Sequence, residues 1–142
     1  MEKAPCRCWV EISKRRIAEN FAAVRGVVGP AVEVMPVVKA DAYHHGAVEV
    51  SRVLAGEGAR WLAVSNVEEG VELRDAGIGV RILVMAGLLG GEWETAVARD
   101  LTPVIHSLGE LALLERIALR TGRRLTWHLK IDTGLGRLGT RA

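Results

Sequence analysis

Apolar runs alternate with amphipathic stretches along most of the chain, at a spacing that predicts repeated strand and helix units. Short, nearly continuous apolar runs predict strands at 9–12, 32–40, 61–64, 81–85, 101–106 and 125–132. Between them, apolar residues recur every three or four positions, which predicts helices between Ser13 and Gly29, over about ten residues from 47, and at 67–76, 92–99 and 108–120.

The spacing of the expected strands indicates a parallel sheet. Those that start at 32, 61, 81, 101 and 125 are separated by 29, 20, 20 and 24 residues, which leaves room for a returning helix rather than a hairpin. An eight-stranded barrel takes about 250 residues, whereas this chain has 142. The glycine-rich segment 134–142 after the last expected strand favours part of a barrel over a complete open sheet. We therefore expect an α/β fold, a partial (β/α)8 barrel with about five parallel strands, flanking helices and two open edges.

Composition and charge exclude several classes of protein. The chain is 49% hydrophobic and 25% charged, which excludes a disordered or fibrous chain, and nineteen basic against seventeen acidic residues give a net charge of +2. This balance offers no electrostatic basis for binding nucleic acid or an anionic membrane. The longest nearly apolar run, 82–91, is about half a membrane span, and the first residues lead into no apolar signal segment, so the expected location is cytoplasmic.

The cysteines and histidines do not predict a metal site. Cys6 and Cys8 are too close to bridge each other readily, and no second cysteine pair accompanies them. None of the four histidines has ligand spacing. We expect two reduced thiols and no metal.

The first candidate for chemistry is Lys39, which follows two valines at the end of the expected strand 32–40. Residues 35, 37 and 39 share one face of a strand. If that face lines a barrel, Lys39 is partly desolvated, and because desolvation lowers the pKa of a lysine, the neutral amine suits a Schiff base with a carbonyl compound. The alternative is a lysine that merely extends from the strand end into water. Tyr43 lies just beyond, where its hydroxyl suits a phosphate or a substrate, although an aromatic residue there also serves packing.

The second candidate region is the expected strand 125–132. His128, Lys130 and Asp132 alternate with apolar residues and share one face. In a helix-covered parallel sheet, three ionisable groups on one face indicate the wall of a site, whereas in an exposed strand they would be an ordinary solvated face. The glycine-rich loop that follows carries Arg137; its spacing is not that of a dinucleotide-binding loop, so it is a weak phosphate signal.

Both blocks resemble motifs of one family. Residues 37–46 resemble the cofactor-lysine motif of alanine racemases, residues 128–139 resemble that family's second signature, and Trp9-Val10-Glu11-Ile12 is similar to its opening strand. The resemblance implies a pyridoxal-phosphate enzyme that interconverts L- and D-alanine for bacterial cell wall, with a barrel, a C-terminal β domain and a dimeric assembly. Residues 1–142 would correspond to the N-terminal portion of the barrel, with the C-terminal β domain absent.

The resemblance also implies roles for individual residues. Lys39 would hold pyridoxal phosphate as a Schiff base and act as one of two bases, and Tyr43 would lie near the cofactor phosphate. Arg137 would contact the cofactor's phenolic oxygen and the substrate carboxylate. Lys130 would lie near Arg137, carbamylated in many members, with His128 and Asp132 as supporting residues.

Two departures from the family pattern affect the expected activity. His44 stands where the family commonly has glycine. The family's second base is a tyrosine of the partner subunit's C-terminal domain, whereas the only tyrosine here is Tyr43. We therefore expect little or no turnover by this chain alone, and self-association through its open edges. The alternatives are a non-catalytic barrel protein that binds pyridoxal phosphate for its homeostasis, and an inactive truncation product.

Overall fold

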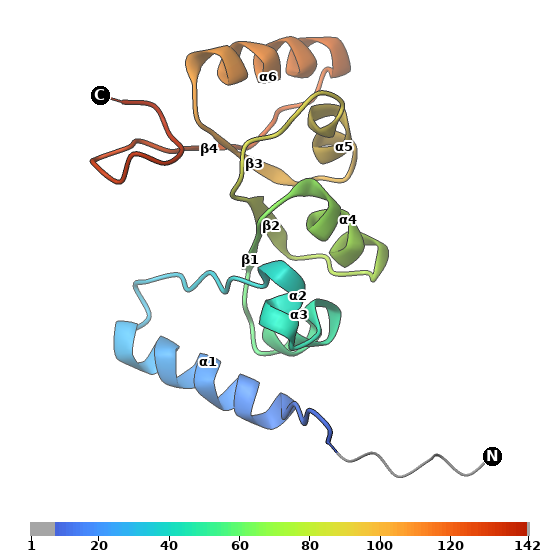
Figure 1. Cartoon of the computed structure of the whole chain (residues 1–142), viewed down its shortest axis with the longest axis vertical. Helices are drawn as coiled ribbons and strands as arrows, with labels where there is room; N and C mark the ends of the chain where they lie inside the picture. Colours follow the sequence, from blue (N-terminus) through green and yellow to red (C-terminus); the bar gives the residue numbers. More distant parts are fainter. Residues whose placement is uncertain (1–7, 142) are drawn as a thin grey trace, which may run out of the picture.

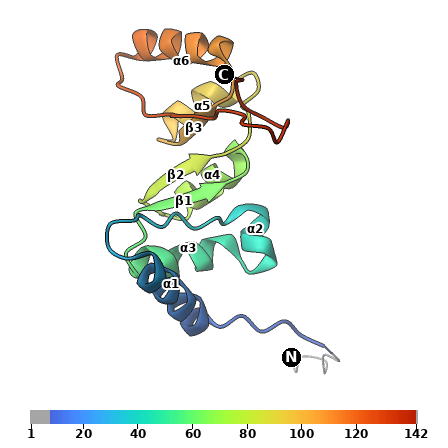
Figure 2. The same cartoon turned by 90° about the vertical axis from the view of Figure 1, so that its left-hand side faces the viewer.

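The computed structural model describes residues 8–141 and shows a parallel sheet covered by helices (Figures 1 and 2). In chain order, the elements are α1 (Lys14–Val28), α2 (Lys39–His44), α3 (Ala47–Gly56), β1 (Trp61–Val64), α4 (Val67–Asp75), β2 (Arg81–Val84), α5 (Glu92–Ala98), β3 (Thr102–Ile105), α6 (Leu108–Thr121) and β4 (His128–Leu129). None of the helices in this described part is both long and apolar enough to cross a lipid bilayer.

The strands lie in the order in which they occur along the chain. β1 pairs with β2, β2 with β3 and β3 with β4, all in parallel, and a helix returns between each pair. A single parallel bridge between Val37 and Ala63 adds one more paired residue to the sheet, beside β1. The expected partial barrel with open edges is confirmed, with four strands and one bridge where about five strands were expected.

Three strand predictions were wrong, one in the existence of the strand and two in its length. Residues 9–12 form no strand within the described chain. The expected strand 32–40 is reduced to the Val37 bridge, because Pro36 has no N–H to donate and the chain turns directly after Val38. The expected strand 125–132 is reduced to His128–Leu129.

The helix predictions were more accurate, because polar caps accompany the apolar spacing. Ser13 caps α1 by accepting a hydrogen bond from the Arg16 N–H at 3.3 Å. Asn66 caps α4 and Ser107 caps α6 in the same way. α1 ends at Val28, followed by Gly29 at φ 78°, as the Gly-Pro pair predicts.

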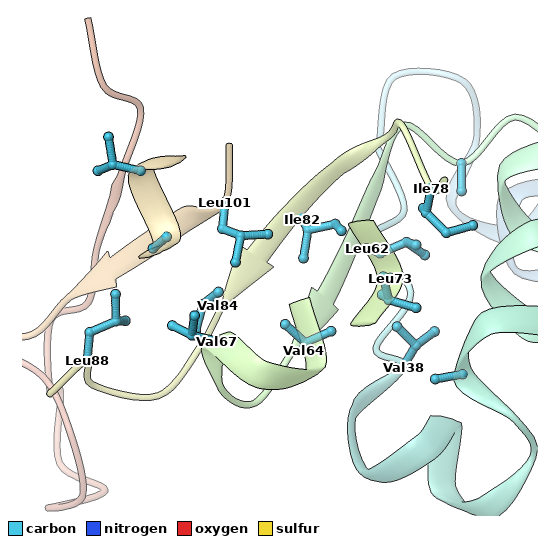
Figure 3. Close-up of a cluster of buried hydrophobic side chains, with 14 of the residues drawn as sticks. Val38, Leu62, Val64, Val67, Leu73, Ile78, Ile82, Val84, Leu88 and Leu101 are labelled. Atoms are coloured by element: carbon cyan, nitrogen blue, oxygen red, sulfur yellow. The ribbon is translucent and has the colours of Figure 1, made fainter. Parts of the chain in front are cut away.

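The face of the sheet that packs against the helices, here called the outer face, holds the larger core. Leu62 and Val64 of β1 and Ile82 and Val84 of β2 pack against Leu73 of α4, and all five are completely buried (Figure 3). Val38 joins this core from the segment before α2 (Figure 3). Alternation along each strand sends the remaining side chains to the opposite face.

The opposite, inner face carries a smaller cluster of Trp61, Ala63, Leu83 and Val104, with Met35 and Met85 packed against it. The Trp61 ring of β1 contacts the His128 ring of β4 edge to face, with centroids 5.4 Å apart. In a flat sheet these strands would lie roughly 14 Å apart, because two strands separate them. The contact therefore shows that the inner face is concave, as in a barrel wall.

Candidate functional site

Lys39 lies at the first residue of α2 and not at the end of a strand, which corrects the sequence-based placement. The predicted shared face of residues 35 and 37 is nevertheless present, because Met35 packs against the inner cluster and Val37 pairs with Ala63 of that cluster. The side chain is half-buried, and its ammonium forms no hydrogen bond or ion pair with any residue from 8 to 141. Lys39 is thus an available amine.

α2 is a left-handed turn. Five consecutive non-glycine residues, Ala40 to His44, have φ values between 49° and 63°. Left-handed helical backbone costs L-residues roughly 1–2 kcal/mol each, so the turn persists only where its surroundings hold it. The Asp41 carboxylate accepts a hydrogen bond from the Ala47 N–H at 2.6 Å, and the Gly46 N–H donates to the Asp41 carbonyl at 3.0 Å.

A second carboxylate holds the start of this turn. Glu69 of α4 accepts hydrogen bonds from the Ala40 N–H and from the Ser65 N–H, each at 2.7 Å. Sequence analysis missed Glu69. The signal was present, because Asn66 and Glu69 have the spacing of a helix capping box.

Tyr43 lies within the left-handed turn. Its side chain is 54% exposed, and its hydroxyl has no partner among the described residues. Tyr43 thus follows Lys39 closely in the sequence, within the same turn, and its phenol is accessible to a ligand.

The second group of predicted residues lies on and after β4. Val104 pairs with His128 and Ile105 with Leu129, and the Lys130 N–H donates to the Ile105 carbonyl at 2.9 Å. Since paired residues share a face, this register puts His128 and Lys130 on the inner face. His128 lies against Trp61 there, and Lys130 is half-buried.

Asp132 organises the glycine-rich loop that carries Arg137. Its carboxylate accepts hydrogen bonds from the N–H groups of Gly134 and Gly136 at 3.1 and 3.0 Å. These bonds, together with the charge of Lys130, hold the pKa of Asp132 below its usual value. Thr140 closes the loop, since its N–H donates to the Lys130 carbonyl at 3.0 Å.

The two groups approach the site from opposite ends of the sheet. Lys39 and Tyr43 lie beside β1, whereas Lys130, Asp132 and Arg137 follow β4, and no described contact joins the two groups. The concave face lies between β1 and β4; Lys130 lies on it, whereas Arg137 is exposed in the loop after β4.

The three predicted site cations form no ion pair with the described residues, a property they share with other basic residues such as Arg16 and Arg116. Within residues 8–141, eight basic side chains form ion pairs with carboxylates, and Lys39, Lys130 and Arg137 are not among them. An unpaired amine and an unpaired guanidinium suit an anionic carbonyl compound, since the amine attacks the carbonyl and the guanidinium binds the anion.

His106 is a further polar group on this face. It follows β3 two positions after Val104, it is buried, and neither ring nitrogen has a hydrogen-bond partner in the structure. No group of three or more histidine, cysteine, aspartate or glutamate residues within 8–141 could hold a metal ion. Cys8 is exposed, and Cys6 lies outside the described residues.

Comparisons with known proteins point to one family. The model of the N-terminal domain of alanine racemase matches residues 12–142. The alanine racemase of Synechocystis is 44% identical over 135 residues, which cover 94% of this chain and 36% of that protein. The alanine racemase of Carboxydothermus hydrogenoformans is also 44% identical, over 92% of this chain and 35% of its own length.

Solved structures give the same result. The alanine racemase of D-cycloserine-producing Streptomyces lavendulae superposes with a TM-score of 0.89 at 37% identity, over 98% of this chain and 36% of its own. That of Clostridium difficile 630 gives a TM-score of 0.83 at 33% identity, over 89% and 33%. The chain spans about a third of the length of these relatives.

Proposed function

Because this chain belongs to the alanine racemase family, we propose that its inner face forms part of an active site that interconverts L- and D-alanine. The proposal assigns the chain to the N-terminal portion of the racemase barrel, in a homo-oligomeric cytoplasmic enzyme that supplies D-alanine for cell wall. The observation that carries the proposal is Lys39, a half-buried, unpaired amine at the start of a left-handed turn beside the concave face.

The donor set fits the cofactor of this family, pyridoxal phosphate. Lys39 offers an unpaired amine for the aldehyde, and Arg137 offers a guanidinium that no carboxylate neutralises. The side chains of Met35 and Met85 supply apolar surface on the same face. In this proposal, Lys39 holds the cofactor covalently, Tyr43 lies beside its phosphate, and Arg137 binds its phenolic oxygen and the alanine carboxylate.

The chemistry divides between the cofactor and the chain. When bound, pyridoxal phosphate would supply an electron sink for the negative charge that develops at the substrate α-carbon. The Lys39 nitrogen takes up or returns that proton on one side of the substrate. Arg137 orients the substrate carboxylate, and Asp132 fixes the loop from which Arg137 extends. Lys130, carbamylated or not, lies on the same face as a supporting group.

Racemisation requires a second base on the opposite side of the α-carbon. The only tyrosine of the chain is Tyr43, and the proposal places it beside the phosphate. In this proposal these 142 residues supply one base and not the second, and we therefore expect no turnover by this chain alone. A barrel protein that binds pyridoxal phosphate without turnover is the alternative function, and the turnover measurement below separates the two.

Reductive trapping tests the cofactor site. The chain is incubated with pyridoxal phosphate, reduced with borohydride and mapped by peptide mass spectrometry. We expect the label on Lys39, its loss in Lys39→Ala, and no change at Lys39 in Lys14→Ala, because Lys14 is an exposed lysine paired with Glu49. Equal labelling of Lys39 and Lys14 in the wild type would contradict cofactor binding at this site.

Turnover is measured separately with L-alanine and the cofactor-loaded chain. We expect no D-alanine above background. Turnover that Lys39→Ala abolishes would refute the expected inactivity and favour the racemase over the binding protein.

The exposed edge supports self-association. Leu129, Ile131 and Leu135 on and after β4 are each 47% or more exposed, and the unpaired edge of β4 presents backbone groups to another chain. Sedimentation velocity should show a concentration-dependent oligomer. A strictly monomeric species at high concentration would contradict this part of the proposal.

A further inference from the structure

The Glu69 carboxylate joins the first turn of α4 to the residue after Lys39. Its Oε2 accepts from the Ser65 N–H and its Oε1 accepts from the Ala40 N–H, both at 2.7 Å. From this geometry we propose that Glu69 is a positioning residue that fixes the direction of the Lys39 side chain. The inference rests on the proposed function, in which Lys39 holds the cofactor.

The physical link is the peptide unit between Lys39 and Ala40. A peptide group is planar, so a hydrogen bond that fixes the Ala40 N–H also fixes the orientation of the Lys39 carbonyl and α-carbon. The same N–H begins the left-handed turn, in which each residue from Ala40 to His44 has an unfavourable φ. A short bond to a charged acceptor at this point opposes relaxation of the turn.

The position of α2 in the fold makes this contact a tertiary one. α2 lies against β1 and α4, and Figure 2 shows it beside the end of the sheet. Glu69 is half-buried and lies 29 residues from Ala40 in the sequence. The contact therefore ties the segment that carries Lys39 to α4, which itself packs against β1 and β2.

Glu110 offers a comparison with Glu69, because it makes the same kind of capping contact at another helix. Glu110 of α6 stands three residues after the cap Ser107, and its Oε2 accepts from the His106 N–H at 2.5 Å, as Glu69 accepts from Ser65. The other oxygen of Glu110 accepts no hydrogen bond from the described residues. Both glutamates thus cap their helices with one oxygen, and only Glu69 uses the second oxygen to hold another segment.

This pair provides a matched experiment. Glu69→Ala and Glu110→Ala each remove one capping contact, but only Glu69→Ala removes the acceptor of the Ala40 N–H. We expect hydrogen exchange of the Ala40 amide, followed by NMR, to become at least about tenfold faster in Glu69→Ala, as the loss of a bond to a charged acceptor predicts. In Glu110→Ala it should stay within about twofold of the wild type. Glu69→Gln, which retains one acceptor oxygen, should give an intermediate rate.

Lys39 reactivity provides the readout that a purely structural role would not change. Reductive labelling with pyridoxal phosphate is expressed as the ratio of label on Lys39 to label on Lys14 in the same sample. Glu69→Ala should lower this ratio about fivefold or more, whereas Glu110→Ala should leave it within about twofold, since Glu110 does not contact the segment of Lys39.

Three results would overturn the inference. One is unchanged Ala40 protection in Glu69→Ala, and another is an equal fall of the Lys39 ratio in both alanine variants. The third is an Ala40 amide that exchanges in the wild type as fast as an unprotected amide. This measurement requires no variant, so it applies even if Glu69→Ala does not fold. If wild-type Lys39 labels no more than Lys14, the proposed function fails, and the Ala40 exchange rate still decides whether Glu69 holds this segment.

Discussion

The two faces of the sheet are built from the same strands and differ in nearly every other respect. On the outer face, Leu62, Val64, Ile82 and Val84 are completely buried against helices. The inner face has a smaller apolar cluster and carries the half-buried, unpaired side chain of Lys130, while Lys39 lies at the start of α2 beside β1. Since side chains alternate along a strand, one strand supplies both the outer core and the surface of the proposed site.

We expect the outer face to contribute mainly to stability and the inner face mainly to the proposed binding of the cofactor. β1 sends Leu62 and Val64 to the outer core and Trp61 and Ala63 to the concave face. The outer core is the larger cluster and includes the completely buried Leu73, whereas Leu83 of the smaller inner cluster keeps 8% of its exposure. Substitutions on the two faces should therefore differ both in stability and in their effect on cofactor binding.

The largest expected difference comes from two leucine truncations. Leu73→Ala in the outer core should lower the free energy of unfolding by about 4 kcal/mol, towards the upper end for a fully buried leucine. Leu83→Ala on the inner face should cost about 2 kcal/mol, because Leu83 is slightly exposed and belongs to the smaller apolar cluster. Urea unfolding measures both; equal losses would mean that the two faces are packed alike.

A smaller effect is expected at the left-handed turn. His44 has a φ of 63°, which glycine adopts without the cost that a side chain imposes. His44→Gly should therefore raise the free energy of unfolding by about 1 kcal/mol. His45→Gly is the control, since His45 has a φ of −99° and its ring bonds to the Ala42 carbonyl. If His44→Gly destabilised the chain as His45→Gly does, the turn would not be strained at this residue.

The smallest effect concerns acid and the loop that carries Arg137. Backbone N–H groups of Gly136 and Gly134 hold the pKa of Asp132 below its unfolded value. A lowered pKa means that the carboxylate supports the loop above the unfolded pKa of about 3.9 and that this support is lost as the pH falls through the folded pKa. The amide shifts of Gly134 and Gly136 should titrate with a midpoint below about 3.9 and cease to do so in Asp132→Asn. A midpoint at or above that value would contradict the role of these bonds.

The sequence predicted the parts of the fold that local patterns determine. Strands such as Arg81–Val84 were found because an apolar run buried on both faces is recognisable in isolation. α1 was found because Ser13 caps an amphipathic repeat. The partial barrel followed from the spacing of such units.

Features that depend on distant partners were not predictable in this way. Residues 9–12 alternate like a strand but find no partner strand within the described chain. The left-handed turn after Lys39 has no local glycine to announce it before Gly46, and it depends on Glu69 from another helix. The candidate site residues were therefore predicted from motifs, whereas their geometry came only from the structure.

The central claim is that the concave face binds the cofactor, and methyl NMR tests it directly. Pyridoxal phosphate is titrated into chain labelled at leucine, valine and isoleucine methyl groups. The account predicts shifts at Leu83 and Val104 on the inner face, with Leu62 and Ile82 on the outer face unmoved. Shifts confined to the outer methyl groups, or none at saturating cofactor, would contradict it.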